Sequence, residues 1–206
     1  MEFEFFRLTA VYGHLIACSL AIGSVLVSDF TAVRQLVSGD PYRGEDPQHL
    51  KNLQKTVTLA LIALWISGAV ILAIDVSDKG MGYFDNPKLQ AKIIIVCLLT
   101  LNGILLHNTV LPLMKKAKSL LNLSWGQRAF ALFTGTFSAA SWFYAALLGV
   151  GRPLSWKYPL MVLLTPYSAL IAGGFAGMLG LVAWAQYRTN KVPCRHHEHG
   201  TLVGAF

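Results

Sequence analysis

Side chains that can bind a proton or a metal ion are rare inside the apolar stretches of this sequence. His14, Asp29 and His107 lie within such stretches, Lys92 opens one, and His49 lies just ahead of another. An ionisable group in hydrocarbon is costly, and proteins that keep one there generally use it. Imidazole nitrogens bind metal ions, and carboxylate–histidine chains carry protons. The sequence therefore points to metal, cofactor or proton chemistry.

The elements that position these groups are helices long enough to cross a bilayer. Apolar residues make up 54% of the 206 residues and charged ones 13%, whereas soluble domains carry about a quarter charged residues. A run of about 20 apolar residues spans the hydrocarbon core. We predict an all-α integral membrane bundle of about five transmembrane helices in a single domain, residues 1–190, followed by a tail, residues 191–206. The predicted helices cover about 8–36, 47–74, 88–114, 125–149 and 159–187.

Capping and breaking residues mark the ends of these helices. Asp46 before Pro47 and Asn86 before Pro87 each combine a good N-cap with a proline at the first helical position. Ser124 is suited to cap the fourth helix, and Gly151 to end it. In the last helix, Pro166 predicts a kink or an irregular segment before it.

The charges predict an orientation. The net charge is +7, and its basic residues lie in the short segments between apolar runs, where they suit anionic lipid headgroups better than nucleic acid. Because basic residues concentrate on the cytoplasmic side, the N-terminus is expected outside and the C-terminus in the cytoplasm. The basic residues assigned to that side are Arg34, Arg43, Lys51, Lys55, Lys115, Lys116, Lys118, Arg128, Arg188, Lys191 and Arg195.

The predicted topology sorts the ionisable residues into two levels. The first and third helices run in the same direction, so His14 and Lys92 share an outer level. At 1.5 Å per residue, Asp29 and His107 lie about 22 Å deeper, and His49 adds to that inner level. The inner residues could bind a second haem or a metal ion, or could form a proton path. Alternatively, Asp29 and His49 face water and His107 forms a single interhelical bond.

The surroundings of His14 suggest a flat ligand. Ala10, Ala17, Cys18 and Ala21 share its helix face, and such small residues leave room beside the imidazole. Imidazole is a standard axial ligand of haem iron. The same stripe also suits close packing of two transmembrane helices, which is the alternative interpretation.

Several segments together resemble a known family. They are His14-Leu-Ile with the later Gly23, the stretch HLKNLQKTVTLALIALWISGAVIL, Lys92 within KLQAKIIIVCLLTLNGILLH, and the segments LMKKAK and WGQRAFALF. Over about residues 5–150 the chain resembles HemJ-type membrane protoporphyrinogen oxidases and, more loosely, the copper-resistance D membrane domain. His107 and Pro112 depart from the family pattern.

The resemblance implies a b-type haem and an oxidoreductase or electron-transfer protein of the cell inner membrane. His14 would be an axial ligand. Lys92 would be the essential catalytic residue, as the second ligand or as the partner of a propionate or substrate carboxylate. The expected cofactor is one haem b, or two if His107 also binds one. Porphyrin would be the substrate and quinone an acceptor, with helix-four hydroxyls as a candidate quinone pocket.

Two other functions remain open at this stage. A copper-handling transporter would bind its metal with His14, His107 and His49, or with the tail from Cys194 to His199. A non-catalytic subunit would anchor a partner membrane protein. Gly173 and Gly177 form a GxxxG face in the last helix, which predicts close packing within the bundle or a homo-oligomer.

Overall fold

The computed structural model describes residues 2–38, 47–117 and 123–191. All of its regular elements are helices, as predicted. They are α1 (Glu2–Ser38), α2 (Pro47–Lys79), η1 (Met81–Asp85), α3 (Pro87–Leu105), η2 (Leu106–Val110), α4 (Leu111–Ala117), α5 (Trp125–Val150), η4 (Arg152–Leu154) and α6 (Leu160–Lys191).

Five helical segments of the described chain are long and apolar enough to cross a membrane, which confirms the predicted bundle. They cover Glu4–Arg34, Lys51–Lys79, Pro87–Ala117, Trp125–Val150 and Leu160–Arg188. The third is composite, because α3, η2 and α4 follow one another without a break. The elements extend past the predicted limits mainly at α1, which begins at Glu2, and at α2, which continues to Lys79.

The helix ends follow local signals in the sequence. Asn86 caps α3, and its side chain accepts a hydrogen bond from the backbone N–H of Lys88 at 3.1 Å. Ser124 precedes α5, where its backbone N–H donates to the Gln127 side chain at 3.4 Å. Gly151 follows the last residue of α5. These three boundaries lie where capping chemistry predicts them; Asp46, the cap predicted for α2, lies outside the described residues.

The two internal prolines have different local effects. Pro112 lacks the N–H that an α-helix needs, and its ring crowds the carbonyl four residues earlier. Just before Pro112 lies η2, a π-helical turn that is wider than an α-helix. The backbone N–H of Leu111, which follows η2, donates to the carbonyl of Leu106, five residues earlier. Pro166 lies inside α6. The segment leading into α6 is irregular, with a 3-10 turn at η4 and a φ of 62° at Trp156.

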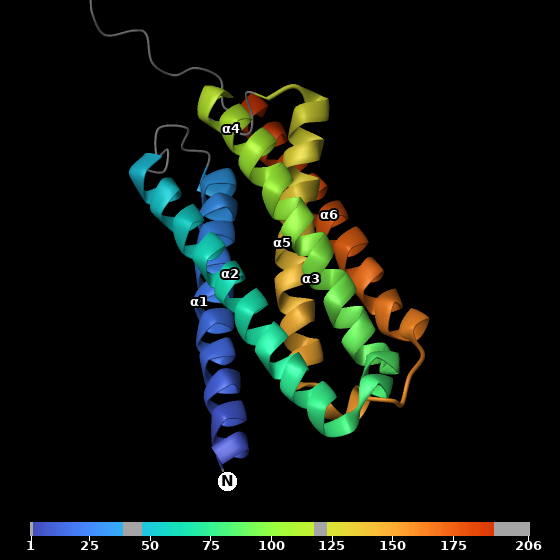
Figure 1. Ribbon diagram of the computed structural model, residues 1–206. Helices are drawn as coiled ribbons and strands as arrows, with labels where there is room; N and C mark the ends of the chain where they lie inside the picture. Colours follow the sequence, from blue (N-terminus) through green and yellow to red (C-terminus); the bar gives the residue numbers. More distant parts are fainter. Residues whose placement is uncertain (1, 39–46, 118–122, 192–206) are drawn as a thin grey trace, which may run out of the picture.

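The bundle has two ends, which we name from Figure 1. The N-terminal end holds the start of α1 and the α2–α3 and α5–α6 connections, and the C-terminal end holds α4, the start of α5 and the end of α6. Helix α1 packs chiefly on α2, while α5 packs on both α3 and α6. Half of the apolar stretch of α5 is buried, against 11–22% in the other four spans, so α5 is the central helix.

Three small clusters form the core. One joins α3, α5 and α6 through Ile95, Leu148 and Tyr167. The second joins α1, α2, α3 and α5 around Trp142, and the third joins α1, α5 and α6 through Leu36, Leu132 and Val182. Many large apolar side chains point outward instead. Lipid is as apolar as a protein core, so this exposure is normal for a protein that spans a membrane.

Candidate functional site

His14 is held by the neighbouring helix. Its Nδ1 lies 2.8 Å from Oγ of Ser67 in α2. The single hydroxyl proton of Ser67 is directed to the carbonyl oxygen of Ala63, at 2.6 Å within the same helix. Ser67 Oγ therefore accepts the hydrogen bond, and Nδ1–H of the imidazole donates it.

This arrangement determines which nitrogen of His14 can bind a ligand. In a neutral imidazole, a proton on Nδ1 leaves Nε2 with a free lone pair. No described residue forms a hydrogen bond with Nε2. An orienting partner on one nitrogen and a free lone pair on the other is the usual state of a metal-binding histidine.

Lys92 reaches the same level from α3. A Cβ added at Gly149 of α5 would lie 3.8 Å from Nζ of Lys92, so the ammonium rests against a glycine of the central helix. Its charge interacts with both His14 and Cys18 of α1. The half-buried His14 and Lys92 therefore come together at one level of the bundle, contributed by α1, α2, α3 and α5.

The small residues of α1 have two different surroundings. Ala17 and Ala21 are buried at 7% and 0% exposure, and Ala21 packs in the cluster around Trp142. These two alanines therefore serve the packing of α1 against its neighbouring helices. Gly13 faces open space, and Gly68 of α2 lies beside the imidazole, where an added Cβ would be 3.6 Å from Cε1.

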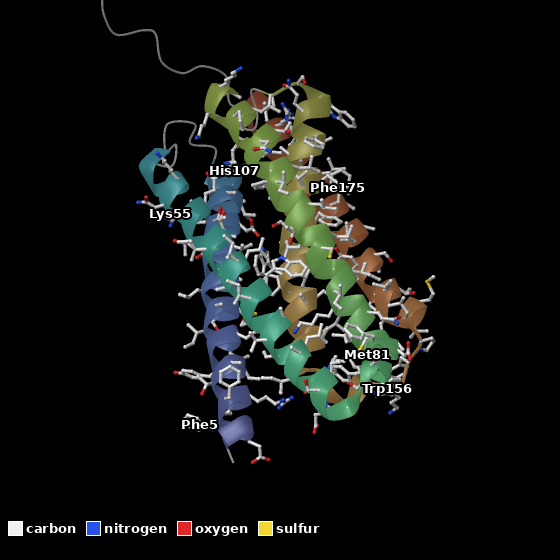
Figure 2. The ribbon with its side chains drawn as sticks, viewed as in Figure 1. Phe5, Lys55, Met81, His107, Trp156 and Phe175 are labelled. Carbon is white, nitrogen blue, oxygen red and sulfur yellow. The ribbon has the colours of Figure 1, made fainter. Side chains whose placement is uncertain are left out.

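The predicted inner level does not form a compact group in the described residues. His107 is exposed within η2 and its Nδ1 contacts the side-chain amide of Gln54 in α2. It lies toward the C-terminal end, as does Lys55 (Figure 2). Asp29 is half-buried in α1, and the side chain of His49 lies outside the described part. Across the described residues, no three His, Cys, Asp or Glu side chains gather as metal ligands.

The predicted tail ligands, from Cys194 to His199, also lie outside the described residues. Two hydroxyls of the candidate quinone pocket of helix four form hydrogen bonds within the protein. The hydroxyls of Thr134 and Ser141 donate to carbonyls of α5 itself, and Ser141 also bonds the hydroxyl of Tyr167 in α6 at 2.8 Å. Thr136 Oγ1 is buried and has no hydrogen-bond partner among the described groups.

An ionic cluster around a buried carboxylate near the N-terminal end was not predicted from the sequence. Asp75 of α2 is only 7% exposed. Its carboxylate bonds Arg7 of α1 at 3.1 Å and Lys79 at 3.2 Å. Lys79 lies over the ring of Tyr83, 4.6 Å from its centroid, and Tyr83 also bonds Asp75. Burial, and then the Asp75 carboxylate, raise the pKa of Tyr83, so its hydroxyl remains a donor.

Two signals could have led to the missed residues. Asp75 and Lys79 have the i, i+4 spacing of a helical ion pair, and Asp75 directly follows the apolar run of its helix. Ser67 is a lone hydroxyl in that run, but its pairing with His14 depends on how α1 and α2 are rotated. Sequence spacing within one helix cannot specify that rotation.

Comparison with known proteins identifies no relative for this arrangement. The chain matches no protein-family model, no curated protein and no solved structure.

Proposed function

We propose that this protein is a membrane oxidoreductase or electron-transfer protein that binds one haem b through His14. The observation that carries the proposal is the hydrogen bond from His14 Nδ1–H to Ser67 Oγ, which leaves Nε2 as the ligand nitrogen. The resemblance to HemJ-type oxidases involves the same histidine. A b-type haem is held by such axial ligands and without covalent bonds to the ring.

The donor set favours a group beside His14. Nε2 supplies the first ligand. Because Ala17 and Ala21 are packed against other helices, the group would extend from His14 toward the N-terminal end. Lys92 approaches from α3 with a positive charge. It would either bind the iron, once deprotonated, or hold a propionate or a substrate carboxylate.

A bound haem would supply one-electron transfer between its ferric and ferrous states. The residues of this chain would do the rest. Ser67 keeps the imidazole in one tautomer and one orientation. If the family reaction is retained, protoporphyrinogen is the electron donor and a quinone or a partner protein the acceptor, in the cell inner membrane.

A single haem agrees best with the inner residues. His107 is exposed in the described structure. It lies fifteen residues from Lys92 in one continuous helical segment, which corresponds to about 22 Å. His107 therefore belongs to a different level from His14. Within the described residues, the copper alternative lacks a cluster of three ligands.

An absorption spectrum tests the proposal. The wild-type protein, purified in detergent from haem-sufficient cells, should show a Soret band and a sharpened alpha band after reduction with dithionite. A pyridine haemochrome assay should give one haem per chain. His14→Ala should lose the haem, whereas His107→Ala, the matched control, should keep it. A colourless wild-type protein, or an unchanged spectrum in His14→Ala, would refute the assignment.

A further inference from the structure

A small hollow lies far from His14, between the start of α5 and the end of α6 at the C-terminal end of the bundle. Its volume is about 50 Å³. A site for one water needs about 10–15 Å³ on this scale, so the hollow has room for a group the size of a phosphate. Two polar side chains, those of Arg128 and Gln186, line it together with Leu179, Val182 and Ala183.

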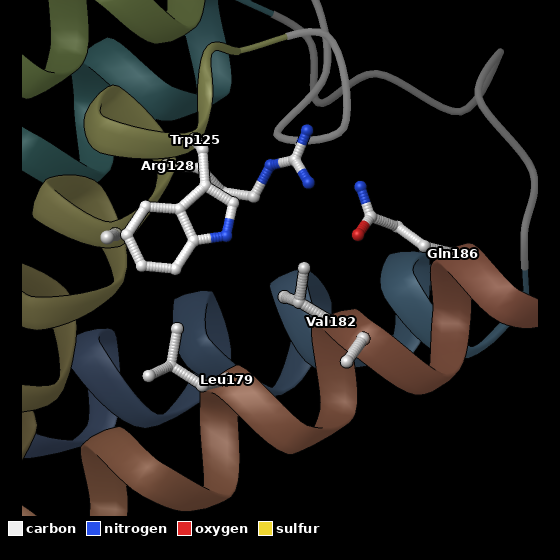
Figure 3. Close-up of a pocket in the computed structure, with 7 residues that line it drawn as sticks. Trp125, Arg128, Leu179, Val182 and Gln186 are labelled. Atoms are coloured by element: carbon white, nitrogen blue, oxygen red, sulfur yellow. The ribbon is translucent and has the colours of Figure 1, made fainter.

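The polar side chains face each other across this hollow. Figure 3 shows the Arg128 guanidinium and the Gln186 amide pointing toward one another, above Leu179 and Val182 of α6. Arg128 is 9% exposed, and one of its nitrogens donates to the carbonyl of Leu123 at 3.0 Å. This bond fixes the planar guanidinium, which matches the oxygen geometry of a phosphate.

The depth of the hollow corresponds to the lipid headgroups. Trp125 begins one segment that is long and apolar enough to cross a membrane, and Arg188 ends another. Arg128 and Gln186, which lie within three residues of these limits, therefore belong near the membrane boundary. The Trp125 ring is 77% exposed at the rim. Trp184 is also exposed and stacks with Arg188, whose guanidinium carbon is 4.9 Å from the ring. Exposed tryptophans are characteristic of the headgroup layer.

The charge of this end favours an anion. In the described part of the chain, Asp29 is the acidic residue of this end, and basic side chains greatly outnumber it. The basic side chains of this end are Arg34, Lys51, Lys55, Lys115, Lys116, Arg128 and Arg188. Basic pockets between transmembrane helices bind anionic lipid headgroups. The headgroup of a zwitterionic lipid also carries a positive charge, which the basic side chains of this end would repel.

We propose that this hollow binds the headgroup phosphate of an anionic phospholipid. The phosphate oxygens accept hydrogen bonds from the Arg128 guanidinium and the Gln186 amide. The acyl chains lie over the apolar floor that Leu179 and Val182 form. The lipid bridges the first turn of the central helix and the last turns of α6, and it stabilises the bundle at this end.

A lipid titration of the full chain tests this site. Delipidated protein in a neutral detergent is titrated with phosphatidylglycerol or phosphatidylcholine, and the midpoint of thermal unfolding is followed. Phosphatidylglycerol should raise the midpoint of the wild type and phosphatidylcholine should not. Arg128→Gln should weaken the apparent affinity for phosphatidylglycerol by about fivefold or more, as expected for one basic residue near an anionic lipid.

Two further variants make the test specific. Ala183→Leu fills the hollow without changing charge, and it should also abolish the lipid effect. Arg188→Gln removes a charge outside the hollow at the same end and should preserve the effect. The proposal is overturned if both lipids act alike, if Ala183→Leu binds as the wild type does, or if Arg188→Gln loses as much as Arg128→Gln. An equal shift with millimolar inorganic phosphate would also overturn it.

Discussion

The hydrogen bond between His14 and Ser67 is the residue-scale feature on which the proposed haem site depends. It joins α1 to α2 and presents one nitrogen of the imidazole as an acceptor. Partners of this kind orient a metal-binding histidine and raise its basicity. The serine should therefore affect the strength of the iron–nitrogen bond without touching the iron.

Replacing Ser67 tests this orienting role. Ser67→Ala removes the acceptor of Nδ1–H, and we expect haem affinity to fall roughly 10-fold to 100-fold, the usual effect of losing such a partner. Ser67→Thr keeps a hydroxyl at the same place and should retain most of the affinity. The rate at which haem transfers to apomyoglobin measures the difference. Equal transfer rates for the alanine and threonine variants would show that the hydroxyl has no such role.

Replacing Lys92 distinguishes its two proposed roles. Holding a carboxylate requires a positive charge, which arginine retains, whereas arginine cannot deprotonate to bind iron. We expect Lys92→Arg to keep the wild-type haem spectrum. We expect Lys92→Met to lower haem content, because it removes a positive charge that acts on His14. A change to a high-spin spectrum in Lys92→Arg would instead identify Lys92 as the second ligand.

At the element scale, close approach of α5 and α6 depends on one particular glycine. A Cβ at Gly174 would lie 2.7 Å from Cγ2 of Thr136, whereas nothing lies within 4 Å of a Cβ at Gly173 or Gly177. Thr136 is β-branched, so few χ1 rotamers are open to its side chain within a helix and it cannot easily move aside. The glycine that permits helix packing inside the chain is therefore outside the GxxxG pattern, and Gly173 and Gly177 face away from the bundle.

This difference predicts two unlike alanine variants. Gly174→Ala should push α6 away from α5 and lower the free energy of unfolding by about 1–3 kcal/mol, the usual cost of overpacking. Gly177→Ala should be neutral or slightly stabilising, because alanine is the better helix former. Thermal or denaturant unfolding in detergent compares them. A Gly174→Ala protein as stable as Gly177→Ala would show that the helices are farther apart.

The ionic cluster around Asp75 connects α1 and α2 near the N-terminal end. Asp75→Asn would break its bonds to Arg7 and Lys79. Both cations are about half exposed, at 48% and 47% of their side chains, so water screens part of the loss. We expect unfolding to become easier by about 1–2 kcal/mol. Asp78→Asn, at an exposed position of the same helix, is the control and should unfold like the wild type.

For the whole molecule, the orientation in the membrane is a prediction from charge alone. Basic residues at the C-terminal end of the bundle predict that this end lies in the cytoplasm. Green fluorescent protein fused after Phe206 should then fluoresce, and alkaline phosphatase fused there should be inactive. The opposite pair of results would reverse the topology and would place the proposed lipid site in the outer leaflet.

The architecture could be predicted because its causes are local. Runs of apolar residues have the length of a bilayer, Asn86 caps the start of α3, and Gly151 follows the last residue of α5. The contacts between helices could not be predicted in the same way. In a soluble protein, the polar face of a helix shows which side points outward. Here lipid and core are equally apolar, so the sequence does not show how the helices are rotated. The pairing of His14 with Ser67 and of Arg7 with Asp75 could therefore not be predicted. The widened turn before Pro112 was hidden too, because proline can also produce a simple kink.

The central place of α5 has a consequence for how the protein is made. It is the most buried of the five spans, and its buried face carries Arg128, Thr134, Ser141 and Tyr144. These groups suit a protein interior better than lipid. During synthesis α1, α2 and α3 leave the ribosome before α5, and α6 follows it. Helix α5 packs on both α3 and α6. The polar face of α5 is therefore fully covered only after α6, the last helix to be made, has packed against it.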